Sequence, residues 1–185
     1  SGAGLRVHSP KAEIISEEAF QHLLSQLNQY KHSNYTAHDL EMLSIVFTIA
    51  FRTGMRINEI AGIKLKNVKS ISDISVVLTP NPYLRLKSSS AKRRVLLTAL
   101  VKKDELKILT LFIAQQERMG VSYLFSQGVN KQPLPTYFFS NLMRILWDGV
   151  LGQDNHSYTF HSLRHTAISQ LTLAINGSAL VEVMT

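Results

Sequence analysis

Hydrophobic residues recur at intervals of three and four along most of the chain, which is the spacing of helices with one buried face. Ser16 can cap the free amides of a first helix, and two acidic residues follow it in the positive first turn. Residues 40–51 are apolar almost all round, which predicts a buried central helix ending at Gly54. Further helices are predicted over residues 56–63, 104–119, 136–151 and 162 to about 176. We expect Gly177 to end the last of these and residues 178–185 to begin another helix.

The spacing changes to a strand-like alternation between residues 74 and 98. Three short runs, 74–78, 83–87 and 94–97, are separated by prolines and a serine-rich loop. In the second run, Lys87 falls on the face opposite Leu84 and Leu86, where it can reach a ligand. The pattern therefore predicts an α+β fold that is mostly α-helical, with a small three-stranded antiparallel sheet.

Composition is typical of one domain with a sizeable core, since 45% of the 185 residues are hydrophobic. We expect residues 1–13 to be a cloning remnant and N-terminal linker, and residues 14–185 to form the domain. The absence of cysteine excludes disulfides and thiolate metal sites and fits a reducing cytoplasm. No apolar stretch approaches the roughly 18 residues of a membrane span, and the start does not resemble a signal peptide. The histidines lack metal-ligand spacing and there is no glycine-rich phosphate loop, so no metal or cofactor is expected.

The chain carries a net charge of +7 that is unevenly distributed. Residues 52–107 hold 13 Lys or Arg against four Asp or Glu, a balance of +9, and the remainder sums to −2. Such a surface favours an anionic partner, most simply nucleic acid, although a protein with a lysine-rich face has the same composition. Residues 87–94 hold four positive charges, and Lys92, Arg93 and Arg94 either contact a DNA backbone or belong to a solvated loop.

The most informative features of the sequence are two segments that contain arginine: Thr-Gly-Met-Arg-Ile-Asn-Glu-Ile from residue 53 and Phe-His-Ser-Leu-Arg-His from residue 160. Arg56 and Arg164 are 108 positions apart, and arginine presents a planar fork that matches phosphate oxygens. In the second segment His161, Arg164 and His165 fall along one edge of an apolar stripe. Taken singly, the histidine and arginine could be an ordinary helix edge, and Arg56 with Glu59 a surface pair worth ~0.2 to 0.5 kcal/mol. Taken together, the segments indicate a clamp on one phosphate.

The order of these segments, with a lysine on a small hairpin between them, resembles the catalytic domain of tyrosine recombinases, the phage integrase family. The resemblance runs from about residue 14 to 185. It implies that Arg56 and Arg164 clamp the phosphate, that Lys87 is the hairpin lysine and that His161 is the histidine of the second segment. His165 also fits the family's wording and is grouped with Lys92, Arg93 and Arg94 as a DNA contact.

The resemblance also implies a reaction and its setting. A tyrosine attacks a DNA phosphodiester, forms a 3′-phosphotyrosyl link and expels a 5′-hydroxyl, so that strands are exchanged without a nucleotide cofactor. Two arginines offset the charge on the phosphate oxygens without a metal, while His161 and Lys87 assist the attacking and leaving oxygens respectively. The expected partner is double-stranded DNA, bound by a homo-tetramer of the parent protein during integration or excision of a mobile element in a bacterial cytoplasm, at the nucleoid.

One feature departs from the family pattern. The family places a Gly-His pair and then its tyrosine after the second arginine, but only 21 residues follow Arg164. All six tyrosines precede the second segment, so the nucleophile is expected beyond Thr185. This fragment is therefore expected to be monomeric and unable to cleave DNA. A type IB topoisomerase, a DNA-binding protein without catalysis and a basic helical scaffold stay open as alternatives.

Overall fold

The computed structural model describes residues 14–31, 34–70, 72–82, 93–128, 132–151 and 158–184. Its main helices are α1 (Glu17–Gln29), α2 (Ala37–Thr53), α3 (Ile57–Ala61), α4 (Leu97–Leu100), α5 (Lys103–Met119), α6 (Thr136–Leu151) and α7 (Phe160–Met184). A 3-10 turn at Leu65–Asn67 leads into the strands β1 (Val68–Lys69), β2 (Ser75–Val77) and β3 (Arg94–Leu96). The predicted fold class, mostly helical with a small three-stranded antiparallel sheet, is confirmed.

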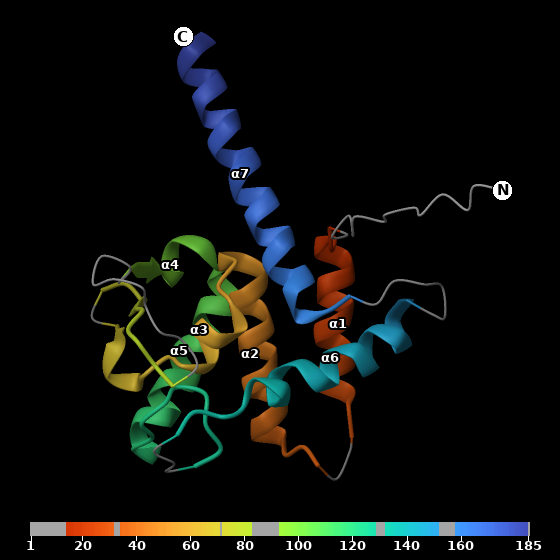
Figure 1. Ribbon diagram of the computed structural model, residues 1–185, viewed down its shortest axis with the longest axis vertical. Coiled ribbons are helices and arrows are strands. Elements are labelled where there is room, and N and C mark those ends of the chain that lie inside the picture. The colour runs from red at the N-terminus through yellow and green to blue at the C-terminus, as the bar shows by residue number, and fades with distance from the viewer. Residues whose placement is uncertain are drawn as a thin grey trace, which may run out of the picture.

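Helix α2 forms the centre of the molecule, as its apolar sequence predicts. It begins with a capping box in which the Thr36 hydroxyl accepts from the Asp39 N–H and the Asp39 carboxylate accepts from the Thr36 N–H. Helices α1, α3, α4, α5 and α7 all pack against it (Figure 1). The rings of Phe20 and Phe51 stack with centroids 4.0 Å apart where α1 meets α2. Burial on nearly every side, rather than helix propensity, stabilises this element.

The sheet is antiparallel in the order β1-β2-β3, with Val76 opposite Val68 on one side and Val95 on the other. The predicted runs at 74–78 and 94–97 correspond to β2 and β3. The predicted run at 83–87 lies outside the described residues, and the sequence did not predict β1. Two residues are too few to produce a visible alternation, so this edge strand is defined by its pairing.

Helix α7 corrects the prediction at the end of the chain. We expected Gly177 to end this helix, but α7 continues through it to Met184 as one helix of 25 residues. A lone glycine costs a helix only about 1 kcal/mol, and the described glycines with positive φ are Gly54 and Gly120. The N-terminal half of α7 packs on α2, and the rest projects from the body (Figure 1). Leu173 and Ile175 on the projecting part are each 69% exposed.

Candidate active site

Arg56 is presented by a buried turn between α2 and α3. Gly54 ends α2 in the left-handed conformation, with φ 71°, and its N–H donates to the Ala50 carbonyl at 3.0 Å. Met55 next to it is 1% exposed, so the turn is anchored in the core. Arg56 then takes the N-cap position of α3 with an extended backbone, and its side chain is 60% exposed. The buried turn therefore fixes the backbone while the guanidinium faces outward.

Glu59 is the buried carboxylate of this site. Its side chain is 5% exposed, and its Oε2 accepts from the Arg56 N–H at 3.2 Å. Oε1 lies 3.6 Å from Nη1 of Arg56, and Oε2 also accepts from Nη2 of Arg93 at 2.7 Å. The alternative that Arg56 and Glu59 form an ordinary surface pair is wrong for Glu59, because its carboxylate is buried and contacts two arginines.

Arg164 reaches the same turn from α7. The stripe that contains Phe160, Leu163 and Ala167 is buried, which holds this part of α7 against the core. Nη1 of Arg164 donates to the Gly54 carbonyl, and this hydrogen bond joins residues 110 positions apart. Partial burial lowers the pKa of Arg164, and the neighbouring charges of Arg56 and Arg93 lower it further while Glu59 opposes them. Arg164 therefore lies within electrostatic range of Arg56.

Arg56 and Arg164 line one cavity of about 400 Å³. Its polar lining residues come from the start of α3, from the first turns of α6, and from α7 and the residue before it: Arg56, Asn58, Thr136, Ser140, Thr159, His161 and Arg164. Asn58, Thr136 and Ser140 do not stand out in the sequence, because small polar residues are common near the starts of helices. The cavity offers two arginine forks and several neutral donors, a set suited to phosphate oxygens.

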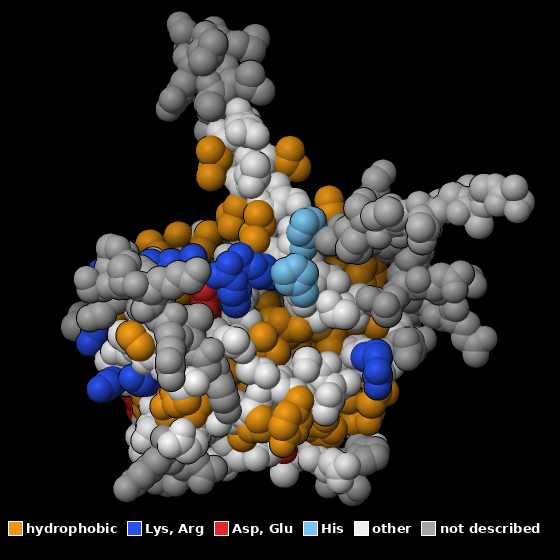
Figure 2. Space-filling view, in the orientation of Figure 1, with side chains coloured by type: hydrophobic (Ala, Val, Ile, Leu, Met, Phe, Trp, Pro, Cys, Tyr) orange, Lys and Arg blue, Asp and Glu red, His pale blue; other side chains and the backbone are white. Residues whose placement is uncertain are grey.

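The two histidines of the second segment lie beside the cavity in the predicted relation. His161 is exposed in the first turn of α7 and lines the cavity, whereas His165 is partly buried one turn later. Their ring centroids are 6.5 Å apart. Figure 2 shows histidine side chains next to a group of Lys and Arg side chains at the base of the projecting helix. The structure thus brings His161 to the arginines and leaves His165 at the edge of the site.

The basic hairpin is described only at its end. Lys87 and Lys92 lie outside the described residues, so the structure does not place the predicted hairpin lysine. Arg93 is paired with Glu59, whereas Arg94 is exposed on β3. Both arginines line a second hollow of about 450 Å³ that also includes Arg164. Sequence reasoning placed Arg93 in a peripheral loop and missed its ion pair, because nothing local shows that Glu59 is buried.

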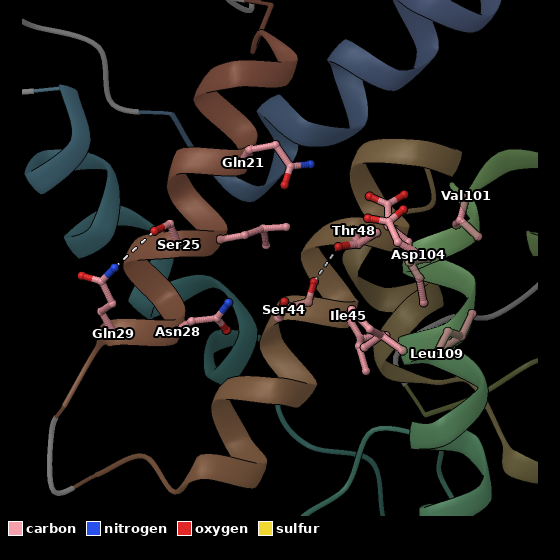
Figure 3. A pocket seen from close by; sticks show the side chains of 14 residues that line it. Gln21, Ser25, Asn28, Gln29, Ser44, Ile45, Thr48, Val101, Asp104 and Leu109 are labelled. Carbon is pink, nitrogen blue, oxygen red and sulfur yellow. Dashed lines mark hydrogen bonds between the residues drawn. The ribbon is translucent and has the colours of Figure 1, made fainter.

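A separate hollow of about 370 Å³ lies between α1, α2 and α5 (Figure 3). It is lined by apolar side chains and by neutral or acidic ones such as Gln21, Asn28, Ser44 and Asp104, with no Lys, Arg or His among its lining residues. It does not suit an anionic ligand. Within the described ranges, no group of three or more His, Asp or Glu is placed to hold a metal ion. The described helices include none that is long and apolar enough to cross a membrane.

Three solved structures of similar fold are recombinases or integrases. The chain matches the Tn1549 transposon integrase in complex with transposon right-end DNA, with a TM-score of 0.66 and 15% identity over 92% of this chain and 56% of that one. It matches the XerH recombinase bound to difH, in a pre-cleavage complex, with a TM-score of 0.63 and 17% identity over 87% of this chain and 43% of that one. A lambda integrase dimer bound to a COC′ core site gives a TM-score of 0.54 and 13% identity over 84% and 39%.

These likenesses concern the fold, and the chain spans about half the length of the structures it matches. No curated protein sequence matches the chain. The sequence model of the phage integrase family, however, matches residues 13–183, nearly the whole chain. The fold, the paired arginines and this match agree, and the chain belongs to the phage integrase family.

Proposed function

We propose that this chain is the catalytic core of a site-specific DNA recombinase that cuts and rejoins DNA through a 3′-phosphotyrosyl intermediate. The observation that supports this most strongly is the shared cavity, in which Arg56 and Arg164 meet from opposite parts of the chain. The solved structures of similar fold include complexes of recombinases with DNA. Double-stranded DNA is accordingly the proposed substrate, and residues 14–185 the proposed catalytic domain.

The proposed roles follow from the chemistry of the cut. The tyrosine oxygen forms a bond to phosphorus, the bond from phosphorus to the 5′ oxygen breaks, and the leaving oxygen takes up a proton. Arg56 and Arg164 bind the nonbridging oxygens, on which negative charge increases in the transition state. His161 assists removal of the tyrosine proton, and Lys87 supplies the proton to the leaving oxygen. Because the charge on phosphorus oxygens is offset by guanidinium groups, the proposed reaction needs no cofactor.

The nucleophile remains a prediction. Tyr158 is the tyrosine nearest the second segment, and its ring lies 4.9 Å from that of Trp147, centroid to centroid, which supports a packing role. We propose that the attacking tyrosine belongs to a part of the parent protein outside residues 1–185. Incubation of this chain with a nicked duplex and detergent gel electrophoresis should then reveal no covalent adduct. A covalent adduct formed by this chain alone would overturn the prediction.

The parent protein gives the decisive test of the reaction. Mixed with DNA from its own host and stopped with detergent, it should become linked to a 3′ phosphate end, and Arg164→Gln should abolish the link. Strand exchange between two DNA molecules would identify a recombinase, whereas relaxation of supercoils without exchange would identify a type IB topoisomerase. DNA binding with neither activity would support the noncatalytic alternative and refute the proposal.

The proposal extends to the assembly of the parent protein and to its location. A lambda integrase structure of the same fold, with a TM-score of 0.50 and 12% identity, is a tetramer on a Holliday junction. We propose a tetramer on DNA for the parent protein and a monomer for this fragment, which light scattering with and without DNA would distinguish. A nucleoid-associated, cytoplasmic location in a bacterium stays a prediction for fluorescence imaging of the tagged parent.

A further inference from the structure

Arg93 is tied to the arginine turn through Glu59. The side chain of Arg93 is 52% exposed, and its Nη2 donates to Oε2 of Glu59 at 2.7 Å. The same oxygen accepts from the Arg56 N–H at 3.2 Å. A single buried carboxylate oxygen therefore holds Arg93 beside the backbone of the residue that we propose as a phosphate ligand. Half of the Arg93 side chain nevertheless stays accessible to a ligand.

Arg93 is also close to Arg164. Both side chains line the hollow of about 450 Å³ that borders the Gly54 turn. The positive charge of Arg93 is one of the causes that lower the pKa of Arg164, after burial and Arg56. Arg164 lines both this hollow and the cavity that contains Arg56. Arg56 and Arg93 are thus both within electrostatic reach of Arg164, beside the same turn.

We propose that Arg93 is a third phosphate-binding arginine of the active site, positioned by Glu59, and not a peripheral contact to the DNA backbone. This inference rests on the proposed function and extends it to a residue outside the two arginine segments. Arg94, its neighbour on β3, lines the same hollow but is exposed, and among the described residues it forms no ion pair that would position it as Glu59 positions Arg93. The two adjacent arginines therefore have different tasks.

The charge of the cluster supports a third arginine. Arg56, Arg164 and Glu59 together have a net charge of +1, which matches the single negative charge of a phosphodiester. Attack by an oxyanion adds a second negative charge at phosphorus, and Arg93 raises the net charge of the cluster to +2. A site that matches the transition state better than the ground state accelerates the reaction. Among the described side chains, Arg93 supplies the additional positive charge that matches the transition state.

Inorganic phosphate is a suitable probe, because it tests the site without a target sequence or a nucleophile. The chain is labelled with ¹⁵N, and the arginine Nε–Hε resonances are followed during a phosphate titration at low ionic strength, where screening is weak. The signals of Arg56, Arg93 and Arg164 should shift with one common dissociation constant, while that of Arg94 stays in place. Arg93→Gln should weaken phosphate binding about tenfold or more, and the matched control Arg94→Gln less than about twofold.

The possible outcomes separate the two proposals. If Arg56 and Arg164 respond but Arg93 does not, or if Arg93→Gln and Arg94→Gln weaken binding equally, the third arginine is refuted and the phosphate clamp stands. If neither Arg56 nor Arg164 responds, both proposals fall. Thermal unfolding shows whether Arg93→Gln is folded. If it is not, Arg93→Lys replaces it, since lysine can keep the pair with Glu59 but loses the planar fork. Arg93→Lys should weaken phosphate binding about threefold or more, and unchanged affinity would refute the inference.

Discussion

Gly54 is the residue on which the site's geometry depends. Its left-handed backbone ends α2, and its carbonyl accepts from Arg164. A Cβ atom at this position would lie 3.2 Å from Cγ1 of Ile168 on α7. The turn thus requires glycine both for its backbone conformation and for the close approach of α7.

Gly54→Ala should therefore disturb stability and phosphate binding together. Gly120 ends α5 with a similar φ of 68°, but nothing lies within 4 Å of the Cβ position there. We expect Gly120→Ala to lower the free energy of unfolding by about 1 kcal/mol and Gly54→Ala by roughly 2 kcal/mol or more. Denaturant unfolding measures both values. Equal losses would show that α7 does not press on the turn.

At the residue scale, the sequence predicted the two arginines but not Glu59, the carboxylate that positions the arginine side chains. Arg56 and Arg164 stand out because each occurs in a recognisable local pattern. Glu59 occupies an ordinary i, i+3 position relative to Arg56, and its burial depends on what covers it. A charge that looks like a surface partner in sequence can therefore be the enclosed centre of a site.

Among the elements, α1, α2 and α5 are joined by one group of charged side chains. Arg52 donates to Glu17 at 2.6 and 2.7 Å and to Glu105 at 2.9 Å, and Lys102 also donates to Glu17 at 2.7 Å. The hydrogen bond from Arg52, opposed by partial burial and aided by Lys102, lowers the pKa of Glu17 from 4.5 to about 2. The cluster therefore stabilises the packing only while Glu17 is ionised.

This shift predicts how stability depends on pH. A carboxyl group with a lowered folded-state pKa stabilises the fold above its unfolded pKa, and that contribution is lost as pH falls from 4.5 to about 2. Because the Glu17 side chain is 41% exposed, we expect a loss of only roughly 1–2 kcal/mol. Glu17→Gln should flatten this part of the unfolding-versus-pH curve, while its exposed neighbour Glu18→Gln serves as control. An unchanged curve in Glu17→Gln would contradict the prediction.

Helix α7 is also joined to the start of the described chain. The buried Thr166 hydroxyl accepts from the Ile15 N–H at 2.9 Å and donates to the Ser162 carbonyl at 2.9 Å. The hydrogen bond from Ile15 attaches the helix that carries Arg164 to the segment before α1.

Thr166→Val keeps the shape of the side chain but leaves the buried Ile15 N–H without its partner. We expect the free energy of unfolding to fall by about 1–3 kcal/mol. Thr166→Ser keeps the oxygen and should cost less than about 1 kcal/mol. Thermal unfolding of the three proteins checks the order, and a valine variant as stable as the serine variant would contradict it.

At the scale of the whole molecule, the positive charge predicts binding to DNA that weakens with salt. Lys92 and Arg94 flank the proposed active-site arginine and are expected to contact the phosphate backbone. Replacing both with alanine should reduce the slope of log affinity against log salt by about 2, since each phosphate contact contributes about 0.9. Arg118→Ala, in the last turn of α5, is the control. Fluorescence anisotropy over a salt series provides the measurement, and an unchanged slope would refute the contact.

The sequence by itself determined the central helix, the helical and strand classes, the two arginine segments and the family, because each is expressed in local spacing or wording. Only the tertiary structure decided that the Gly54 carbonyl holds Arg164, that Glu59 is buried with Arg93, and that α7 continues through Gly177. The first two features depend on contacts between residues far apart in the chain. The third depends on the balance between the free-energy cost of one glycine and the stability of the rest of the helix. Neither quantity is contained in the local pattern of residues.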